Sequence, residues 1–242
     1  MTNTTNNFFI IQERAYSPFK KKSINLINKA LVKLGFWHQL SPVPNPMVDM
    51  NTIEHRINYY HLLSNVIRNN IEGELAEFGS FTGQCAMLFQ QILDVHESDK
   101  ALHLYDSFEK KFGIDEDIEV LLKKNFDEKK LKQPVIHRGF FELTIPAELP
   151  AAIAFAHIDC GWGGDKNEHK DIMLHCLQHI YNRMSKGSIC VLMDYHEPAV
   201  THTGMDCNPG VKLACDVFFK DKPEKIISLY ANQGSHAYFT RL

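Results

Sequence analysis

The strongest constraint on the fold is an alternation of short apolar runs with longer amphipathic stretches from about residue 50 onward. Five of the apolar runs are typical of strands, at residues 74–78, 101–105, 135–137, 153–158 and 188–193. All but the third lead into stretches with helical spacing, at residues 84–93, 115–125, 168–184 and 210–220. Strands that alternate with helices pair in parallel through crossover helices. The sequence therefore predicts an α/β domain with a mostly parallel sheet.

The end of the chain breaks this alternation. Two apolar runs, at residues 226–229 and 237–240, flank the segment ANQGS, which leaves no room for a helix. Two strands joined by a short loop pair antiparallel. We therefore expect a C-terminal antiparallel hairpin that completes a seven-stranded sheet.

A helix is expected to open this domain. Asn51 and Glu54 have the spacing of a capping box. Ile53, Ile57 and Tyr60 follow on one face of the helix, which we expect to run for about five turns.

Residues 1–48 form an arm that differs in composition from the domain at residues 49–242. Residues 20–37 combine apolar residues at helical spacing with five lysines and no acidic residue, which predicts a basic amphipathic helix. Three prolines between residues 41 and 46 mark a linker. The arm suits a lid, a dimer arm that joins a homo-oligomer, or a docking helix, and the sequence leaves these alternatives open.

Composition narrows the possible partners. The formal net charge of −3 supplies no overall positive field, so we expect no nucleic-acid partner. The chain has no run of about 18 apolar residues and no secretory signal, so we expect a cytoplasmic protein that does not span a membrane. The six cysteines include no C-x-x-C pair and are interpreted as reduced thiols.

Polar residues at the ends of the first two strands predict a nucleoside site. The loop from Glu77 contains Gly79 and Gly83, which permit close approach of the backbone to a ligand. Asp106 ends the second strand, where a carboxylate can accept both hydroxyls of a ribose. The loop lacks the middle glycine of a dinucleotide site, and no phosphate-binding lysine follows it. Glu77 suits an ammonium group instead, so we expect S-adenosylmethionine, which carries ribose, adenine and that group.

Several segments in order, among them GELAEFGSFTGQ, YDSF at residues 105–108 and FELTIP at residues 141–146, are similar to one known group. Over about residues 50–240 the chain resembles the macrocin O-methyltransferase family of metal-assisted sugar O-methyltransferases. The resemblance implies a Rossmann-like class I methyltransferase fold that uses S-adenosylmethionine. It also implies three groups of cofactor-binding residues. The methionine part would lie against Glu77, Phe78, Gly79, Ser80 and Gly83, the ribose against Asp106 and Ser107, and the adenine against Arg138, Gly139 and Phe140.

Methyl transfer to oxygen requires an acceptor held in line and a group that removes its proton. Asp159 and Asp194 follow adjacent strands, and two carboxylates suit Mg²⁺. We expect Asp159 to contact the cofactor as well, and Asp159 or His196 to act as the base, with His169 and His202 as further candidates. The family has paired aspartates at the second position, whereas Met193 replaces the first of them here. A site that includes His157 and His196, or no metal, therefore remains an alternative.

These observations predict an S-adenosylmethionine-dependent O-methyltransferase. Its acceptor would be a hydroxyl of a sugar or another polyhydroxylated small molecule, with assistance from Mg²⁺. Two other functions stay open. One is an inactive binding or scaffold protein with the same fold, and the other is a metal-dependent hydrolase that uses His157, Asp159, Asp194 and His196.

Overall fold

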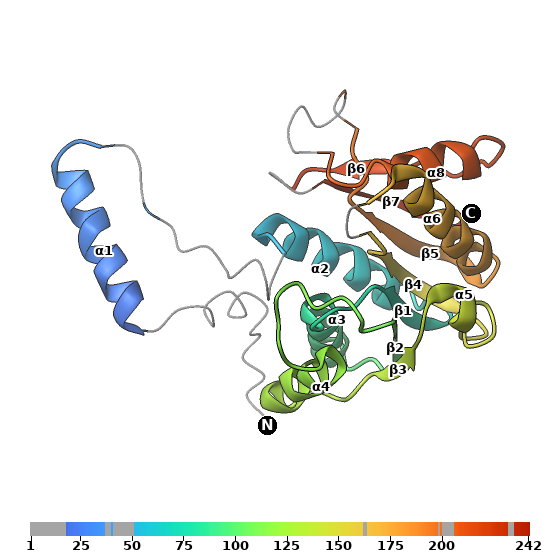
Figure 1. Ribbon diagram of the computed structural model, residues 1–242, viewed down its shortest axis with the longest axis horizontal. Coiled ribbons are helices and arrows are strands. Elements are labelled where there is room, and N and C mark those ends of the chain that lie inside the picture. Colours follow the sequence, from blue (N-terminus) through green and yellow to red (C-terminus); the bar gives the residue numbers. More distant parts are fainter. Residues whose placement is uncertain are drawn as a thin grey trace. The chain divides into compact units, whose positions relative to one another are not determined.

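The computed structural model describes residues 18–36, 40, 51–161, 164–197, 199, 206–231 and 235–242. The chain divides into two compact units, residues 1–50 and residues 51–242 (Figure 1). The strands of the described residues all belong to the second unit.

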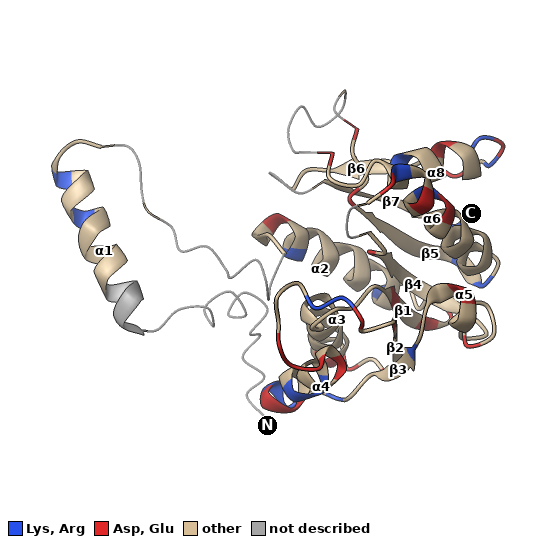
Figure 2. Ribbon diagram, in the orientation of Figure 1, with Lys and Arg blue, Asp and Glu red and all other residues tan. Residues whose placement is uncertain are grey.

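The described part of the first unit is dominated by helix α1, Pro18–Lys33. Its sequence contains lysines but no acidic residue, and Figure 2 shows this on the part that is drawn in colour. The helix ends earlier than expected, because Gly35 takes a left-handed conformation with φ of 77° and the Phe36 amide donates to the Leu31 carbonyl at 3.0 Å.

The second unit is built on a seven-stranded sheet in the order β3-β2-β1-β4-β5-β7-β6. The strands are β1 Glu74–Phe78, β2 Leu102–Asp106, β3 Val135–Arg138, β4 Ile153–Ile158, β5 Met184–Met193, β6 Ile227–Leu229 and β7 His236–Thr240. The strands from β3 to β5 pair in parallel, and β7 pairs antiparallel with both β5 and β6. The predicted mostly parallel sheet and its C-terminal hairpin are confirmed.

Helices cover both faces of this sheet (Figure 1). The helices are α2 Ile53–Arg68, α3 Gln84–Val95, α4 Ile118–Lys129, α5 Phe141–Thr144, α6 Lys166–Tyr181 and α8 Gly210–Phe218. One layer contains α2, α3 and α4, and the other contains α5, α6 and α8. The chain turns from one half of the sheet to the other between β1 and β4, the place where ligands bind in open α/β sheets.

Strand alternation sorts the side chains between the two layers. Phe78 and Ile158 belong to the apolar core that includes α6 and α8. Glu77 and His157, which are paired in register, therefore project toward the opposite layer, where α2 and α3 lie. The sheet thus directs an acid and a histidine into a buried interface.

Several helices differ from the sequence-based expectation by a few residues at their ends, as in α4, which is shifted toward the C-terminus. The helix expected to reach Met184 ends at Tyr181, because Met184 already pairs with Ile153 at the start of β5. In addition, residues 141–144 form a short helix in a segment that we expected to be irregular. Among the residues that the structure describes, no helix combines the length and apolarity that a membrane span needs.

The capping box of α2 lies one residue later than expected. Thr52 accepts a hydrogen bond from the backbone of His55, and the His55 side chain accepts one from the backbone of Thr52. Asn51 is therefore not the capping residue. Its side chain accepts a hydrogen bond from the thiol of Cys85, at 3.1 Å, and so contacts the first turn of α3.

Candidate functional site

The glycine loop between β1 and α3 is shaped by close backbone packing. Gly79 has φ of 91°, and a Cβ atom there would lie 1.9 Å from the carbonyl oxygen of Asp159. Gly83 has φ of 81° and caps α3, where a Cβ atom would lie 2.9 Å from Leu122. Gly79 is thus also required for the ends of β1 and β4 to meet, and Gly83 for the close packing of the loop against α4.

Asp106 holds this loop in place. Its carboxylate accepts hydrogen bonds from the backbone amides of Ser80 at 2.8 Å and Phe81 at 2.9 Å. Its other oxygen accepts from the amide of Phe108 at 2.7 Å. Asp106, which we expected to bind the ribose, therefore has a second role. Sequence reasoning missed this role because the partners of Asp106 are backbone groups. Each carboxylate oxygen can accept two hydrogen bonds, so the Asp106 oxygen that meets Phe108 keeps capacity for a ligand hydroxyl.

The turn predicted to contact adenine lies beside Asp106. The amide of Gly139 donates to the Asp106 carbonyl at 3.0 Å. Arg138 pairs with Glu119 at 2.8 Å, and Phe140 is 51% exposed at the start of α5. The segments that we expected to bind ribose and adenine thus lie next to each other at one edge of the sheet. The ring of Phe140 is exposed to solvent.

Glu77 is the most unusual acid of the site, because its side chain is buried. One carboxylate oxygen lies 3.1 Å from His157 Nδ1, and the other has no hydrogen-bond partner among the described residues. Burial raises the pKa of Glu77, and the charge of Asp106 raises it further. Burial also lowers the pKa of His157 to about 3, so the imidazole is neutral. Its Nε2 atom lies 3.1 Å from the hydroxyl of Tyr59, a residue that the sequence analysis did not single out.

Cys85 approaches the same acid. Ligand atoms of Glu77, Cys85 and His157 all lie within 4.8 Å of one another. A carboxylate, a thiol and an imidazole form a donor set suited to zinc rather than to Mg²⁺. This grouping differs from the predicted histidine-containing alternative, because His157 is paired with Glu77 and not with His196.

Asp159 and Asp194 end the neighbouring strands β4 and β5, as expected. Burial raises the pKa of Asp159, and the charge of Asp194 raises it further. Asn208 donates from its side-chain amide to Asp194 at 2.5 Å. Asp194 itself has φ of 62°, a strained conformation for a residue other than glycine. Two neighbouring carboxylates form an oxygen donor set, which suits Mg²⁺.

Met193 does not intrude on that set. Its sulfur lies 3.3 Å from the Tyr59 hydroxyl, on the α2 side of the sheet. The side chain of Met193 therefore packs against the Tyr59 hydroxyl rather than beside Asp159 and Asp194.

The two described histidines that are candidate bases, His196 and His169, differ in their surroundings. His196 is buried, and its Nδ1 atom lies 2.8 Å from Ser235 Oγ. Within the described residues no hydrogen bond or ion pair joins it to Asp159 or Asp194. His169 instead lies 3.7 Å from the thiol of Cys160. Burial opposes its protonation, but the hydrogen bond to Cys160 and the charges of Cys160 and Asp194 prevail and raise the pKa of His169. His202 lies outside the described residues.

Gly161 makes this arrangement possible. A Cβ atom on residue 161 would lie 2.6 Å from the imidazole of His169 and 2.9 Å from Asn208. The glycine after Cys160 therefore allows α6 to bring a histidine to the carboxyl end of β4.

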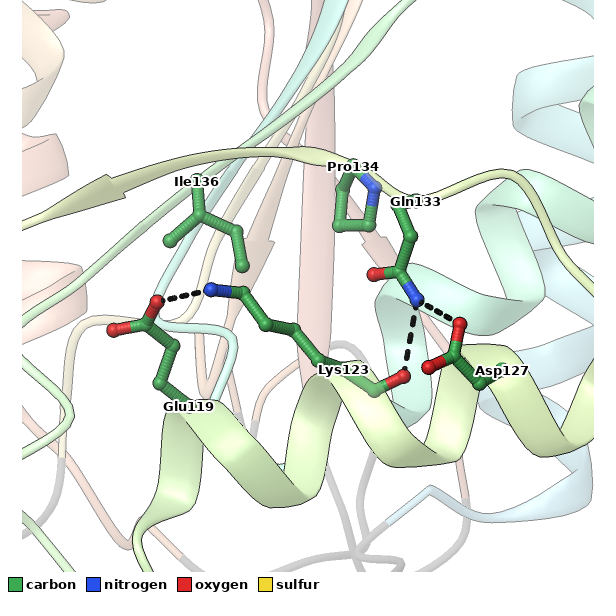
Figure 3. A pocket seen from close by; sticks show the side chains of 6 residues that line it. All are labelled: Glu119, Lys123, Asp127, Gln133, Pro134 and Ile136. Atoms are coloured by element: carbon green, nitrogen blue, oxygen red, sulfur yellow. Dashed lines mark hydrogen bonds and ion pairs between the residues drawn. The ribbon is translucent and has the colours of Figure 1, made fainter.

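A surface depression with a volume of about 470 Å³ lies elsewhere, between α4 and β3 (Figure 3). The polar side chains that line this depression form hydrogen bonds and an ion pair with one another. Lys123 pairs with Glu119 at 2.7 Å, and Gln133 donates to Asp127 at 2.7 Å. It contains none of the predicted site residues. Its lining consists of Glu119, Lys123, Asp127, Gln133, Pro134 and Ile136.

No protein-family profile matches the sequence, and no curated protein matches it. Solved structures do match. The O-methyltransferase NovP is 19% identical with a TM-score of 0.64 over 91% of this chain and 98% of its own. CalS11, a TDP-rhamnose 3′-O-methyltransferase of calicheamicin biosynthesis, is 20% identical with a TM-score of 0.56 over 93% and 95%. An O-methyltransferase from Bacillus cereus, in complex with SAH, is 12% identical with a TM-score of 0.53 over 96% and 95%.

The chain has the class I methyltransferase fold. This confirms the predicted fold class. A methyltransferase fold gathers its ligand-binding residues at the carboxyl ends of the strands, and Glu77, Asp106, Asp159 and Asp194 lie there in this chain. A fold shared at such low identity does not determine the acceptor, which the geometry of the site must indicate.

Proposed function

We propose that the chain is an S-adenosylmethionine-dependent O-methyltransferase that acts on a hydroxyl of a sugar or another polyhydroxylated small molecule, as in the macrocin O-methyltransferase family. The observation that carries the proposal is the placement of two acids, Glu77 and Asp106, beside the glycine loop of a methyltransferase fold. One acid has an oxygen without a partner among the described residues, and the other lies beside the turn at Gly139. The likeness to NovP and CalS11 supports an oxygen acceptor on a sugar.

The cofactor would lie along the strand ends from β4 to β3. The free oxygen of Glu77 suits the ammonium group of its amino-acid part. Asp106 and Ser107 suit the ribose, and Phe140 is an exposed ring that can stack on adenine. The loop residues Phe78, Gly79, Ser80 and Gly83, together with Arg138, Gly139 and Asp159, complete the proposed cofactor contacts. When bound, the cofactor supplies a methyl group on a positively charged sulfur.

The residues of this chain would orient the acceptor and remove its proton. Asp159 is the base that we propose, because it follows β4 at the carboxyl edge of the sheet, next to the glycine loop at Gly79. Of the histidines, His169 has the stronger support, because it interacts electrostatically with Asp194 whereas His196 is paired with Ser235. These side chains follow β4 and β5 or come from α6.

A divalent cation fits the oxygen donors of Asp159 and Asp194. Mg²⁺ bound there would orient a hydroxyl and lower its pKa. Removing the repulsion between two partly buried carboxylates would favour its binding.

Calorimetric titration with S-adenosylhomocysteine, the demethylated product, tests the proposal. We expect micromolar binding to the wild-type protein and an affinity about tenfold lower for Phe140→Ala, since base stacking contributes about 1–3 kcal/mol. Leu143→Ala is the matched control, because Leu143 lies on α5 and is 74% exposed. Binding that is absent at millimolar ligand from folded protein would overturn the methyltransferase proposal.

Turnover distinguishes an enzyme from a scaffold. Formation of S-adenosylhomocysteine from S-adenosylmethionine, nucleotide sugars and Mg²⁺ supports the enzyme, whereas tight cofactor binding without turnover on any hydroxylated acceptor favours a scaffold. The hydrolase alternative is less well supported, because two of its four residues have other partners, His157 with Glu77 and His196 with Ser235.

A further inference from the structure

A chain of buried polar groups links helix α2 to the candidate cofactor site. Tyr59 on α2 is fully buried, and its hydroxyl lies 3.1 Å from Nε2 of His157 on β4. Nδ1 of the same imidazole lies 3.1 Å from the Glu77 carboxylate on β1. Three elements distant in sequence thus meet through two consecutive hydrogen bonds.

The state of Glu77 that binds an ammonium group fixes the direction of both bonds. In that ionised state the carboxylate can only accept, so the Nδ1–H group of His157 donates to Glu77. A neutral imidazole then has a lone pair on Nε2, which accepts the hydroxyl proton of Tyr59. The hydroxyl also lies 3.3 Å from the sulfur of Met193, which is a weaker acceptor.

Packing leaves these side chains little freedom. The Tyr59 ring contacts the ring of Phe89, with centroids 5.5 Å apart, and the ring of His236 at 5.7 Å. Phe89 also packs against His157 at 5.4 Å. The tyrosine and the imidazole are therefore clamped by their surroundings, and one oxygen of Glu77 is fixed by the imidazole.

The second oxygen of Glu77 points to a ligand. It is buried and has no hydrogen-bond partner among the described residues, and the neighbouring thiol of Cys85, a weak donor, only partly favours the ionised form. A buried carboxylate oxygen without a donor is costly unless a bound group supplies one. We propose that His157 and Tyr59 are positioning residues that hold Glu77 with this oxygen open to the ammonium group of the amino-acid part of the cofactor. This inference rests on the proposed function.

Two ligands separate this role from general support of the fold. S-adenosylhomocysteine carries the ammonium group, whereas 5′-methylthioadenosine keeps the adenosine and lacks the amino-acid part. In Tyr59→Phe we expect the affinity for S-adenosylhomocysteine to fall about three- to tenfold, as for one lost hydrogen bond, and the affinity for 5′-methylthioadenosine to stay unchanged. Tyr181→Phe is the matched control, because the Tyr181 hydroxyl bonds to Glu224 at 2.8 Å, outside this chain of groups.

Two variants of His157 are expected to reduce the preference for S-adenosylhomocysteine by different amounts. His157→Leu removes the donor to Glu77, and we expect the larger loss of preference for S-adenosylhomocysteine. His157→Asn can place an amide N–H near the position of Nδ1, so we expect it to restore part of that preference. Because both variants change a buried residue, circular dichroism and thermal unfolding accompany the titrations.

The outcomes are distinct. If the wild-type protein binds neither ligand, the proposed function fails and the inference fails with it. If it binds both equally, or if Tyr59→Phe weakens both equally, the cofactor site stands and the positioning role is overturned. If the purified protein carries one zinc ion per chain that His157→Leu loses, Glu77, Cys85 and His157 form a metal centre and the inference is overturned.

Discussion

The carbonyl oxygen of Asp159 occupies the space that a side chain on Gly79 would need, 1.9 Å from an ideal Cβ position. Gly79 and Asp159 both follow the ends of strands, so their backbones cannot move apart without separating β1 from β4. We expect Gly79→Ala to lower the free energy of unfolding by about 3 kcal/mol or more. Denaturant unfolding followed by circular dichroism measures this.

Gly164→Ala is the control for that substitution. Gly164 also has a positive φ, 103°, but an added Cβ atom would meet nothing within 4 Å. We expect it to cost about 1–2 kcal/mol, from backbone strain alone. Equal effects of the two substitutions would contradict the close approach at Gly79.

Asp106 is expected to contribute to stability as well as to binding. Replacing it by asparagine puts an N–H group where one carboxylate oxygen now accepts backbone amides. We expect Asp106→Asn to lower the free energy of unfolding by about 2–3 kcal/mol in the absence of ligand. Asp216→Asn on the surface of α8 should change it by less than about 0.5 kcal/mol. Unchanged stability in Asp106→Asn would show that the loop is held by other contacts.

Acid is expected to destabilise the domain through His236. Burial, with the nearby His55 and His157, lowers the pKa of His236 to about 2, while the unfolded chain takes up that proton near pH 6.5. The stability contributed by the neutral imidazole is therefore complete above about pH 6.5 and is lost as the pH falls. The loss is at most about 1.4 kcal/mol per pH unit.

Comparison with His236→Gln isolates this contribution. Buried acids such as Glu77 and Asp159, whose pKa values are raised, act in the opposite direction but are present in both proteins. We expect unfolding free energies measured from pH 7 to pH 4 to fall more steeply for the wild-type protein than for the variant. Parallel curves would mean that folding does not lower the pKa of His236.

Mg²⁺ is expected to stabilise the wild-type protein and to leave Asp194→Asn unaffected. A ligand present at a hundred times its dissociation constant adds about 2.7 kcal/mol to stability, and the shift in melting temperature reports it. Asp216→Asn serves again as the control and should keep the full shift. A similar shift in Asp194→Asn would place the cation elsewhere, and chelation that left turnover unchanged would remove the metal from the mechanism.

The sequence predicts features that depend on local pattern. The strands, the C-terminal hairpin and the position of Asp106 at the end of β2 follow from alternation and from residues that are neighbours along the chain. The role of Asp106 in holding the loop does not, because its partners are backbone amides that any sequence would supply.

Long-range partners escape sequence reasoning for a related reason. Tyr59 and His157 are 98 positions apart, and nothing in the spacing of either residue indicates that they meet. His196 follows Asp194 by two residues and invites a catalytic interpretation, yet it bonds to Ser235 beside β7. Two residues that are close in sequence can thus have different partners where a strand ends and a loop begins.

The insertion of β7 between β5 and β6 has a consequence for biosynthesis. Along the edge of β5 away from β4, residues Ile189–Met193 pair with β7. Asn58 on α2 meets His236 across 178 residues of sequence. While the residues before His236 are being synthesised, that edge has no strand to pair with, and Asn58 on α2 lacks this partner. The nascent domain can therefore complete its sheet only after β7 has been synthesised. Until then the unpaired edge of β5 is a site for chaperone binding or for pairing with another chain.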